Sequence, residues 1–192
     1  MYDMDEFNLY KLIFSSKYLS ENQEILEEAK NNQRARVNNL GLNYVVYRFD
    51  LDINDFLPFF NNTHNSEEQL VQNPTPRGLR MFCDYILLVS HHEKTFVVLV
   101  EMKNGKNPTK AAQQLGASEL FMDYIKKSAL RIKDMCGFDS FDTKNIVLKK
   151  VVLKPSPPLR KTTQPGKDNS INWDVSPVVL RSNELPLRKI CK

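Results

Sequence analysis

Apolar residues gather in a few short runs along the chain, and the spacing within each run predicts its secondary structure. Two runs, at residues 79–89 and 95–103, are almost continuously apolar, which is typical of strands covered on both faces. Other segments are rich in β-branched or aromatic residues and predict further strands. These are residues 42–49, 145–153 and 178–181, with residues 187–190 as a last short strand.

Two segments predict helices. Residues 20–39 begin with Ser20, which can cap a helix, and glutamates occupy the turns that follow. Residues 108–134 begin with a proline, carry a partial apolar stripe and are followed by Gly137. Residues 61–76 and 154–173 have no periodic pattern and predict loops. The order of elements predicts an α/β fold, with a mixed central β-sheet flanked by helices.

Length and composition place the chain among globular domains. Its 192 residues suit a single domain (1–192), with a core at about 20–153 and a basic loop and short strands at 154–192. Hydrophobic residues make up 41% and charged residues 26%, which excludes a largely disordered chain. No run approaches the ~20 apolar residues of a membrane span, and the start MYDMDEF does not resemble a signal peptide. We therefore expect a cytoplasmic protein, whose three distant cysteines are free thiols.

Charge is distributed unevenly between the two halves. Residues 1–96 hold 9 Lys/Arg and 14 Asp/Glu, a formal charge of −5, whereas residues 97–192 hold 18 and 9, a charge of +9. A basic half attracts polyanions such as nucleic acid. A solvated lysine-rich surface gives the same composition and is the commoner explanation of charge alone. The sequence contains no GxGxxG or GxxxxGK motif, so a glycine-rich nucleotide-binding loop is excluded.

Charged residues interrupt the two continuous strands at positions that a hairpin would bring together. If these strands are antiparallel and joined by a two- or four-residue turn, Asp84 lies directly opposite Glu101. Lys103 leaves the same face, because it lies two residues further along its strand. A three-residue turn would shift the register and separate the three side chains. The prediction of a charged cluster therefore depends on the turn.

Two facing carboxylates among apolar residues repel each other and need a cation or further hydrogen-bond donors. Lys103 supplies one positive charge, and a divalent ion such as Mg²⁺ or Mn²⁺ would supply two more. Such an ion polarises a phosphoryl oxygen and lowers the pKa of its bound water. Lys103 would orient that water or stabilise the charge that develops on the phosphate. The alternative is an ion-paired strand end without chemistry.

These residues also resemble a known family. Asp84, followed by Glu101-Met102-Lys103 at the end of an apolar strand, is similar to the motif of the PD-(D/E)xK nuclease superfamily. The sequence AAQQL at 111–115 resembles the helix that follows this motif in a small bacterial branch. Cys83 stands where the motif's name has proline, a position that varies widely in the family. The resemblance covers about residues 79–125 and implies a restriction-endonuclease-like αβββαβ core.

The resemblance also implies a role for each matching residue. Asp84 and Glu101 would be metal ligands, with the Met102 carbonyl as a third ligand. Lys103 would be the catalytic lysine, and Gln114 a supporting polar residue near the site. Such nucleases often add an acid from the first helix. The candidates for that acid are Glu24, Glu27 and Glu28, of which Glu28 and Glu24 are preferred.

The function implied is hydrolysis of phosphodiester bonds in DNA with Mg²⁺ or Mn²⁺, in restriction, phage defence or repair. The alternative is a catalytically silent nuclease fold that binds nucleic acid or serves as an assembly subunit. Expected partners are DNA and a second copy of the chain or a larger defence complex, because duplex cleavage needs two sites; a membrane is not expected. The candidate contacts with nucleic acid are Lys106, Lys110, Arg160, Lys161 and Lys167.

Overall fold

The computed structural model describes residues 6–28, 32–49, 82–103, 108–136, 143–154 and 177–192, and these form a mixed α/β fold with two mixed sheets. Its helices are α1 (Glu6–Ile13), α3 (Pro108–Cys136) and α4 (Leu187–Ile190), with 3₁₀ turns at Ser16–Tyr18 and Thr143–Asn145. Its strands are β1 (Ile25–Glu28), β2 (Gln33–Asn38), β3 (Asn43–Arg48), β4 (Tyr85–His91), β5 (Lys94–Met102), β6 (Ile146–Leu153), β7 (Val178–Leu180) and β8 (Glu184–Pro186).

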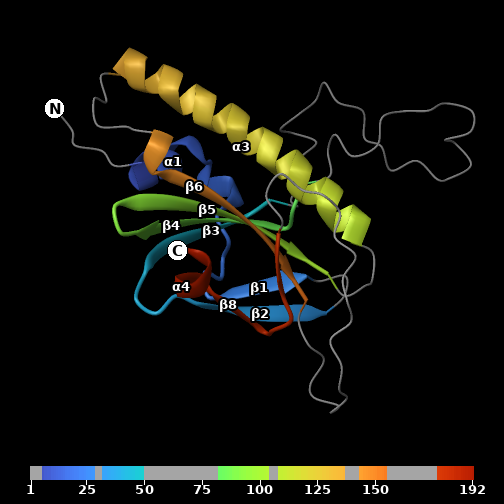
Figure 1. The fold of residues 1–192 in the computed structure, drawn as a ribbon. Coiled ribbons are helices and arrows are strands. Elements are labelled where there is room, and N and C mark those ends of the chain that lie inside the picture. Colours follow the sequence, from blue (N-terminus) through green and yellow to red (C-terminus); the bar gives the residue numbers. More distant parts are fainter. Residues whose placement is uncertain (1–5, 29–31, 50–81, 104–107, 137–142, 155–176) are drawn as a thin grey trace, which may run out of the picture.

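The central sheet has five strands in the order β3-β4-β5-β6-β7. The strands β3, β4 and β5 are antiparallel neighbours, whereas β6 and β7 continue the sheet in parallel with β5. The long helix α3 makes the connection that a parallel β5–β6 pair requires. Figure 1 shows α1 and α3 over one face of this sheet, and β1, β2, β8 and α4 over the other.

A separate apolar core lies on each face of the central sheet, and this explains the continuous apolar runs of β4 and β5. Along β5, Val97 and Leu99 face the helices, whereas Val98 and Val100 face the small sheet. A partly buried ion pair also joins the helical layer to the sheet: Lys150 Nζ of β6 lies 2.8 Å from Glu119 Oε2 of α3. The two cores include residues outside the predicted range 20–153. These are Phe7, Leu9 and Tyr10 at one end and Leu185, Leu187, Ile190 and Cys191 at the other.

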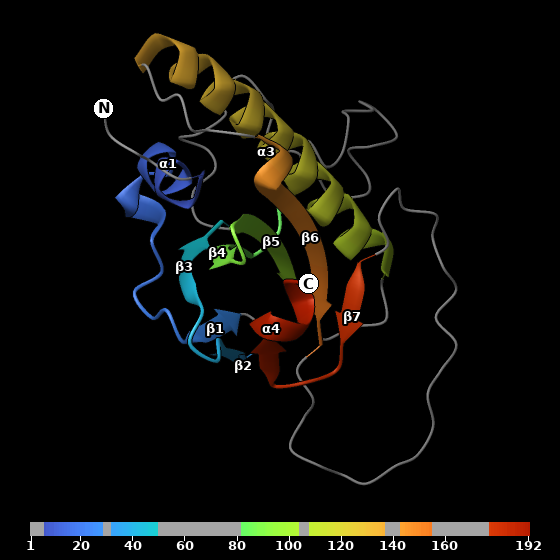
Figure 2. The same ribbon diagram turned by 60° about the vertical axis from the view of Figure 1, so that its left-hand side comes forward.

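The second sheet has three strands, β1-β2-β8, and its position beneath the central sheet is visible in Figure 2. It occupies the segment for which the sequence predicts a helix at 20–39, so that prediction is wrong. The physical reason lies in β2, where Ala35 and Val37 are buried while Arg34 and Arg36 are exposed, an alternation with the period of a strand. Leu185 of β8 pairs with Val37 from far along the chain.

Most other predicted elements are confirmed. The strands predicted at 42–49, 95–103, 145–153 and 178–181 correspond to β3, β5, β6 and β7, and the helix predicted at 108–134 corresponds to α3. The strand predicted at 79–89 corresponds to β4, which begins only at Tyr85. The strand predicted at 187–190 is wrong, because these residues form the single turn of α4. Gly137 and the loops predicted at 61–76 and 154–173, apart from Lys154, lie outside the described residues. No helix in the described ranges is long and apolar enough to cross a membrane.

The turn between β4 and β5 fixes the register on which the predicted site depends. His92 and Glu93 have φ values of 48° and 59°, and His91 pairs with Lys94 on either side of them. Two successive residues with positive φ define the type I′ turn, whose twist suits a two-residue hairpin. The register therefore agrees with the two-residue turn considered above, and the ladder ends with Tyr85 opposite Val100.

Candidate functional site

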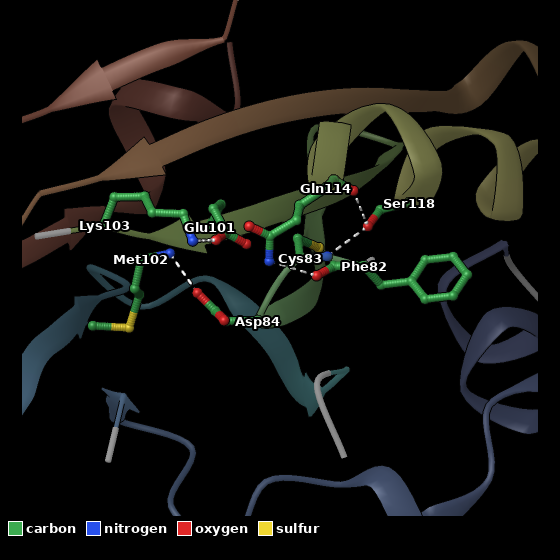
Figure 3. A network of polar contacts seen from close by, with 8 residues as sticks. All are labelled: Phe82, Cys83, Asp84, Glu101, Met102, Lys103, Gln114 and Ser118. Atoms are coloured by element: carbon green, nitrogen blue, oxygen red, sulfur yellow. Dashed lines mark hydrogen bonds and ion pairs between the residues drawn. The ribbon is translucent and has the colours of Figure 1, made fainter. Parts of the chain in front are cut away.

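Asp84 and Glu101 meet at the end of the hairpin furthest from its turn. Asp84 directly precedes β4, and its Oδ2 accepts a hydrogen bond of 2.6 Å from the backbone N–H of Met102 (Figure 3). The charge of Asp84 also acts on the Glu101 carboxyl group, which places the two acids in one electrostatic environment. The structure thus brings together the two carboxylates that the sequence pairs.

Lys103 completes the predicted cluster. Its Nζ forms an ion pair with Glu101 Oε1, although β5 has already ended at Met102. The backbone N–H of Lys103 donates to Leu153 O at 2.9 Å, so a hydrogen bond to β6 holds the residue in line with the strand. The Lys103 side chain keeps 19% of its surface exposed, whereas that of Glu101 is fully buried. The ammonium group therefore lies between the buried acid and the solvent.

Burial and charge change the acidity of Glu101. Desolvation of the buried carboxylate raises its pKa to about 8, and the neighbouring charge of Asp84 acts in the same direction. The hydrogen bond and the positive charge of Lys103 lower this pKa but do not compensate for burial. Near neutral pH the Glu101 carboxyl group therefore binds a proton more readily than an ordinary glutamate does, and its contact with Lys103 Nζ is an ion pair only in the ionised form.

Gln114 reaches the cluster from the first turns of α3. Its Nε2 donates to Phe82 O at 3.0 Å, which fixes the amide between Glu101 and the segment that enters β4 (Figure 3). Two acceptor oxygens, Gln114 Oε1 and Glu101 Oε2, are buried without a hydrogen-bond partner within the described part of the chain. A cation would satisfy both oxygens, because it can interact with two acceptors that have no hydrogen-bond donor.

Ser118, one turn further along α3, was not among the residues that the sequence singled out. Its Oγ accepts a 2.8 Å hydrogen bond from the backbone N–H of Cys83 and donates one of 2.8 Å to Gln114 O. Ser118 is fully buried, and it fixes α3 against the residue that precedes Asp84. The only signal in the sequence is its spacing of four residues from Gln114, which places both on one face of a helix.

An acid from the small sheet also acts on the site. Glu28, at the end of β1, contributes to the raised pKa of Glu101 through its negative charge, and its Oε2 atom is buried. Tyr85 holds β1 in this position, because its hydroxyl donates to Glu27 O and accepts from Glu27 N, both at 2.7 Å. The prediction that this acid lies on a first helix is wrong, because Glu28 lies on strand β1.

The other two candidate acids do not join the cluster. Glu27 forms a surface ion pair with Arg34, with 3.0 Å between Oε1 and Nε. Glu24 is exposed, and its charge acts on Tyr44, where it raises the pKa of the phenol after the larger effect of burial. Of the three glutamates, Glu28 is therefore the one whose charge reaches Glu101.

The remaining predicted residues are divided between three situations. Met102 places its buried side chain in the core below the central sheet, on the face opposite Glu101, while its backbone N–H binds Asp84. Lys110 is exposed in the first turn of α3. The other predicted nucleic-acid contacts lie outside the described residues: Lys106, Arg160, Lys161 and Lys167.

The possible metal ligands at this site are few, and all of them are oxygen atoms, which hard cations prefer. In the described ranges, no three His, Cys, Asp or Glu side chains are grouped closely enough to hold a metal ion. Mg²⁺ is commonly held by one or two carboxylates together with water and substrate phosphates. Asp84, Glu101 and the amide oxygen of Gln114 are oxygen donors of the kind that such an ion takes.

Comparison with known protein families, with curated proteins and with solved structures finds no match for this chain. The fold and the site together define a mixed α/β protein with a buried acid, an ion-paired lysine and a second carboxylate at one end of its central hairpin.

Proposed function

We propose that this protein is a divalent-metal-dependent nuclease that hydrolyses phosphodiester bonds in DNA, as would suit restriction, phage defence or repair. The observation that carries the proposal is the meeting of Asp84, Glu101 and Lys103 at the end of β5, with Glu101 fully buried. A buried carboxylate needs a cation or hydrogen-bond donors as partners, and an acid with a strongly raised pKa often has a chemical role. A divalent ion and a phosphate substrate would together give it both.

Each residue of the cluster has a chemical task in this proposal. Asp84 and Glu101 would hold the ion, which when bound polarises a phosphoryl oxygen and lowers the pKa of a coordinated water. Lys103 Nζ would stabilise negative charge on the phosphate, since its side chain is partly open to solvent. Gln114 would position the entry to β4 through its hydrogen bond to Phe82 O.

The arrangement of elements supports a restriction-endonuclease-like core. The order α1, β3, β4, β5, α3, β6 follows the αβββαβ order that the resemblance implies, with β1 and β2 placed between the first helix and the first strand. In this assignment α1 takes the place of the helix predicted at 20–39. We propose that β1 and β2 are an addition to the core, and that their sheet supplies Glu28 in place of an acid from the first helix.

The experiment is a nicking assay on supercoiled plasmid DNA with Mg²⁺ or Mn²⁺, and with EDTA as the blank. We expect Asp84→Asn, Glu101→Gln and Lys103→Ala each to lower the cleavage rate by about 100-fold or more while the circular dichroism spectrum is retained. The matched controls are Glu21→Gln and Lys17→Ala, exposed residues outside the cluster, which should cleave as the wild type does. Equal cleavage by the controls and the cluster variants would assign the activity to a contaminant.

One observation favours the second candidate, a catalytically silent nucleic-acid-binding or assembly subunit. Lys103 already forms an ion pair with Glu101, so the lysine can serve to compensate the buried acid without any substrate. This candidate predicts DNA binding that is equal in EDTA and in Mg²⁺, with no cleavage under any divalent ion.

A further inference from the structure

A hollow of about 680 Å³ lies at the other end of the central hairpin from the candidate active site, between the β4–β5 turn and α4. Its volume falls within the range of ordinary ligand sites. Its wall is formed largely by side chains that carry, or can carry, a positive charge. They are His91, His92, Lys94, Arg188, Lys189 and Lys192.

The hollow has a one-sided charge. None of the described residues that line it is acidic, and Glu93, within the turn, is not among them. Lys149 adds a further positive charge close by, since its Nζ donates to Lys192 O at 3.2 Å. The cations come from two elements that are far apart in sequence, the β4–β5 turn and the segment 188–192. The fold therefore gathers basic side chains from both elements around one hollow.

The histidines report this crowding. The rings of His91 and His92 lie 3.8 Å apart between centroids. Desolvation lowers the pKa of His91, and electrostatic interactions with His92 and Arg188 lower it further. Phe96 closes the hollow on its apolar side. The two imidazole rings beside several cations suit a phosphate joined to a flat organic group.

The hollow is distinct from the site at Asp84 and Glu101. Lys94 and Glu101 lie at opposite ends of β5, about 23 Å apart at the rise of an extended strand. They also face opposite sides of the sheet, because Phe96 belongs to the core of the small sheet whereas Leu99 belongs to the core under α3. A phosphate in the hollow is therefore not the phosphate placed beside Lys103.

We propose that this basic hollow is a second, phosphate-binding site, which takes the phosphate group of a nucleotide or of a nucleic-acid strand. The site is independent of cleavage, because none of its residues takes part in the cluster at the far end of β5. Arg188 and Lys189 are exposed while their neighbours Leu187 and Ile190 are buried, so α4 presents both cations on its outer side.

The test is a titration of the full chain in EDTA with three probes: inorganic phosphate, a 5′-mononucleotide and a short single-stranded oligonucleotide. The protein has three histidines, so the imidazole proton signals of His91 and His92, assigned by single substitution to Gln, report directly on the hollow. We expect saturable shifts of these two signals. Binding of the mononucleotide would identify a free nucleotide as the ligand, and binding of the oligonucleotide alone would identify a strand.

Charge reversal decides whether the hollow is the site. We expect Arg188→Glu/Lys189→Glu, and separately Lys94→Glu, to weaken binding by about tenfold or more, as loss of charged hydrogen bonds does. The matched control is Lys126→Glu/Lys127→Glu, another adjacent basic pair on a helix, which should change the affinity less than twofold. Equal weakening by the two double variants, or the absence of saturable shifts with all three probes, would overturn the proposal. Loss of plasmid cleavage with binding retained would overturn the nuclease assignment alone.

Discussion

The buried carboxyl group of Glu101 predicts an unusual dependence of stability on pH. Its pKa is raised from 4.5 to about 8 in the folded protein, so the folded state keeps a proton that the unfolded state loses. The contribution of this group to stability is therefore complete below pH 4.5, falls as the pH rises, and levels off above pH 8. At 1.36 kcal/mol per pH unit, the whole shift corresponds to at most about 5 kcal/mol.

Glu101→Gln removes this titration while it keeps nearly the same shape. We expect the variant to gain stability relative to the wild type between pH 5 and pH 8.5, by on the order of 2–5 kcal/mol. The folded-state pKa of Glu101 already includes the effect of Lys103, which pairs with the ionised carboxylate, so the loss of this ion pair in the variant needs no separate term. The change with pH thus isolates the carboxyl group.

The assay is urea unfolding in EDTA, followed by circular dichroism at several pH values and compared at equal m-value. Glu21→Gln is the control, because it removes an exposed acid and should follow the wild type at every pH. A difference between Glu101→Gln and wild type that stays within about 1 kcal/mol from pH 5 to pH 8.5 would refute the reasoning. It would mean that Glu101 is ionised and solvated in the folded protein.

Three further predictions concern the site and the turns. Mg²⁺ or Mn²⁺ should raise the melting temperature more at pH 8.5 than at pH 6, because protons compete with the ion for Glu101. Asp84→Asn should abolish the rise, and an equal rise in that variant would contradict metal binding at Asp84. Ser118→Ala should lower the free energy of unfolding by about 1–3 kcal/mol, since it leaves a buried N–H without its acceptor, whereas Ser128→Ala on the same helix should not. Leu40→Asn should raise the free energy of unfolding by about 0.5–1 kcal/mol, because Leu40 is exposed and has a φ of 46°, a conformation that asparagine tolerates better. Leu40→Ala should give no such gain in the same measurement.

The sequence predicts the central hairpin well because the information there is local. The strands β4 and β5 are separated by two residues only, and alternation within each strand then sets which side chains share a face. Asp84, Glu101 and Lys103 could be brought together on this basis alone. The tertiary contacts of the site could not, since Ser118 and Gln114 act through hydrogen bonds to backbone groups of a distant segment.

The small sheet shows why the structure of residues 20–39 was not predicted correctly. Ser20 followed by several glutamates is typical of the start of a helix, and the local helix propensity of this segment does not indicate a strand. What decides the structure is a partner strand, β8, that lies far along the chain and offers Leu185 to Val37. The contribution of Glu28 to the site depends on the same distant pairing, so it could not be placed from its own segment.

The pairing of β2 with β8 also has a consequence for how the molecule assembles. Arg36 lies opposite Glu184, so nearly the whole polypeptide must be gathered before this contact forms. Contacts between remote segments carry a large loop-closure entropy and slow the folding reaction. We therefore expect the β4–β5 hairpin and α3 to associate first during folding, and β1, β2 and β8 to dock late. Glu28 would then be placed near Glu101 in one of the last steps of folding.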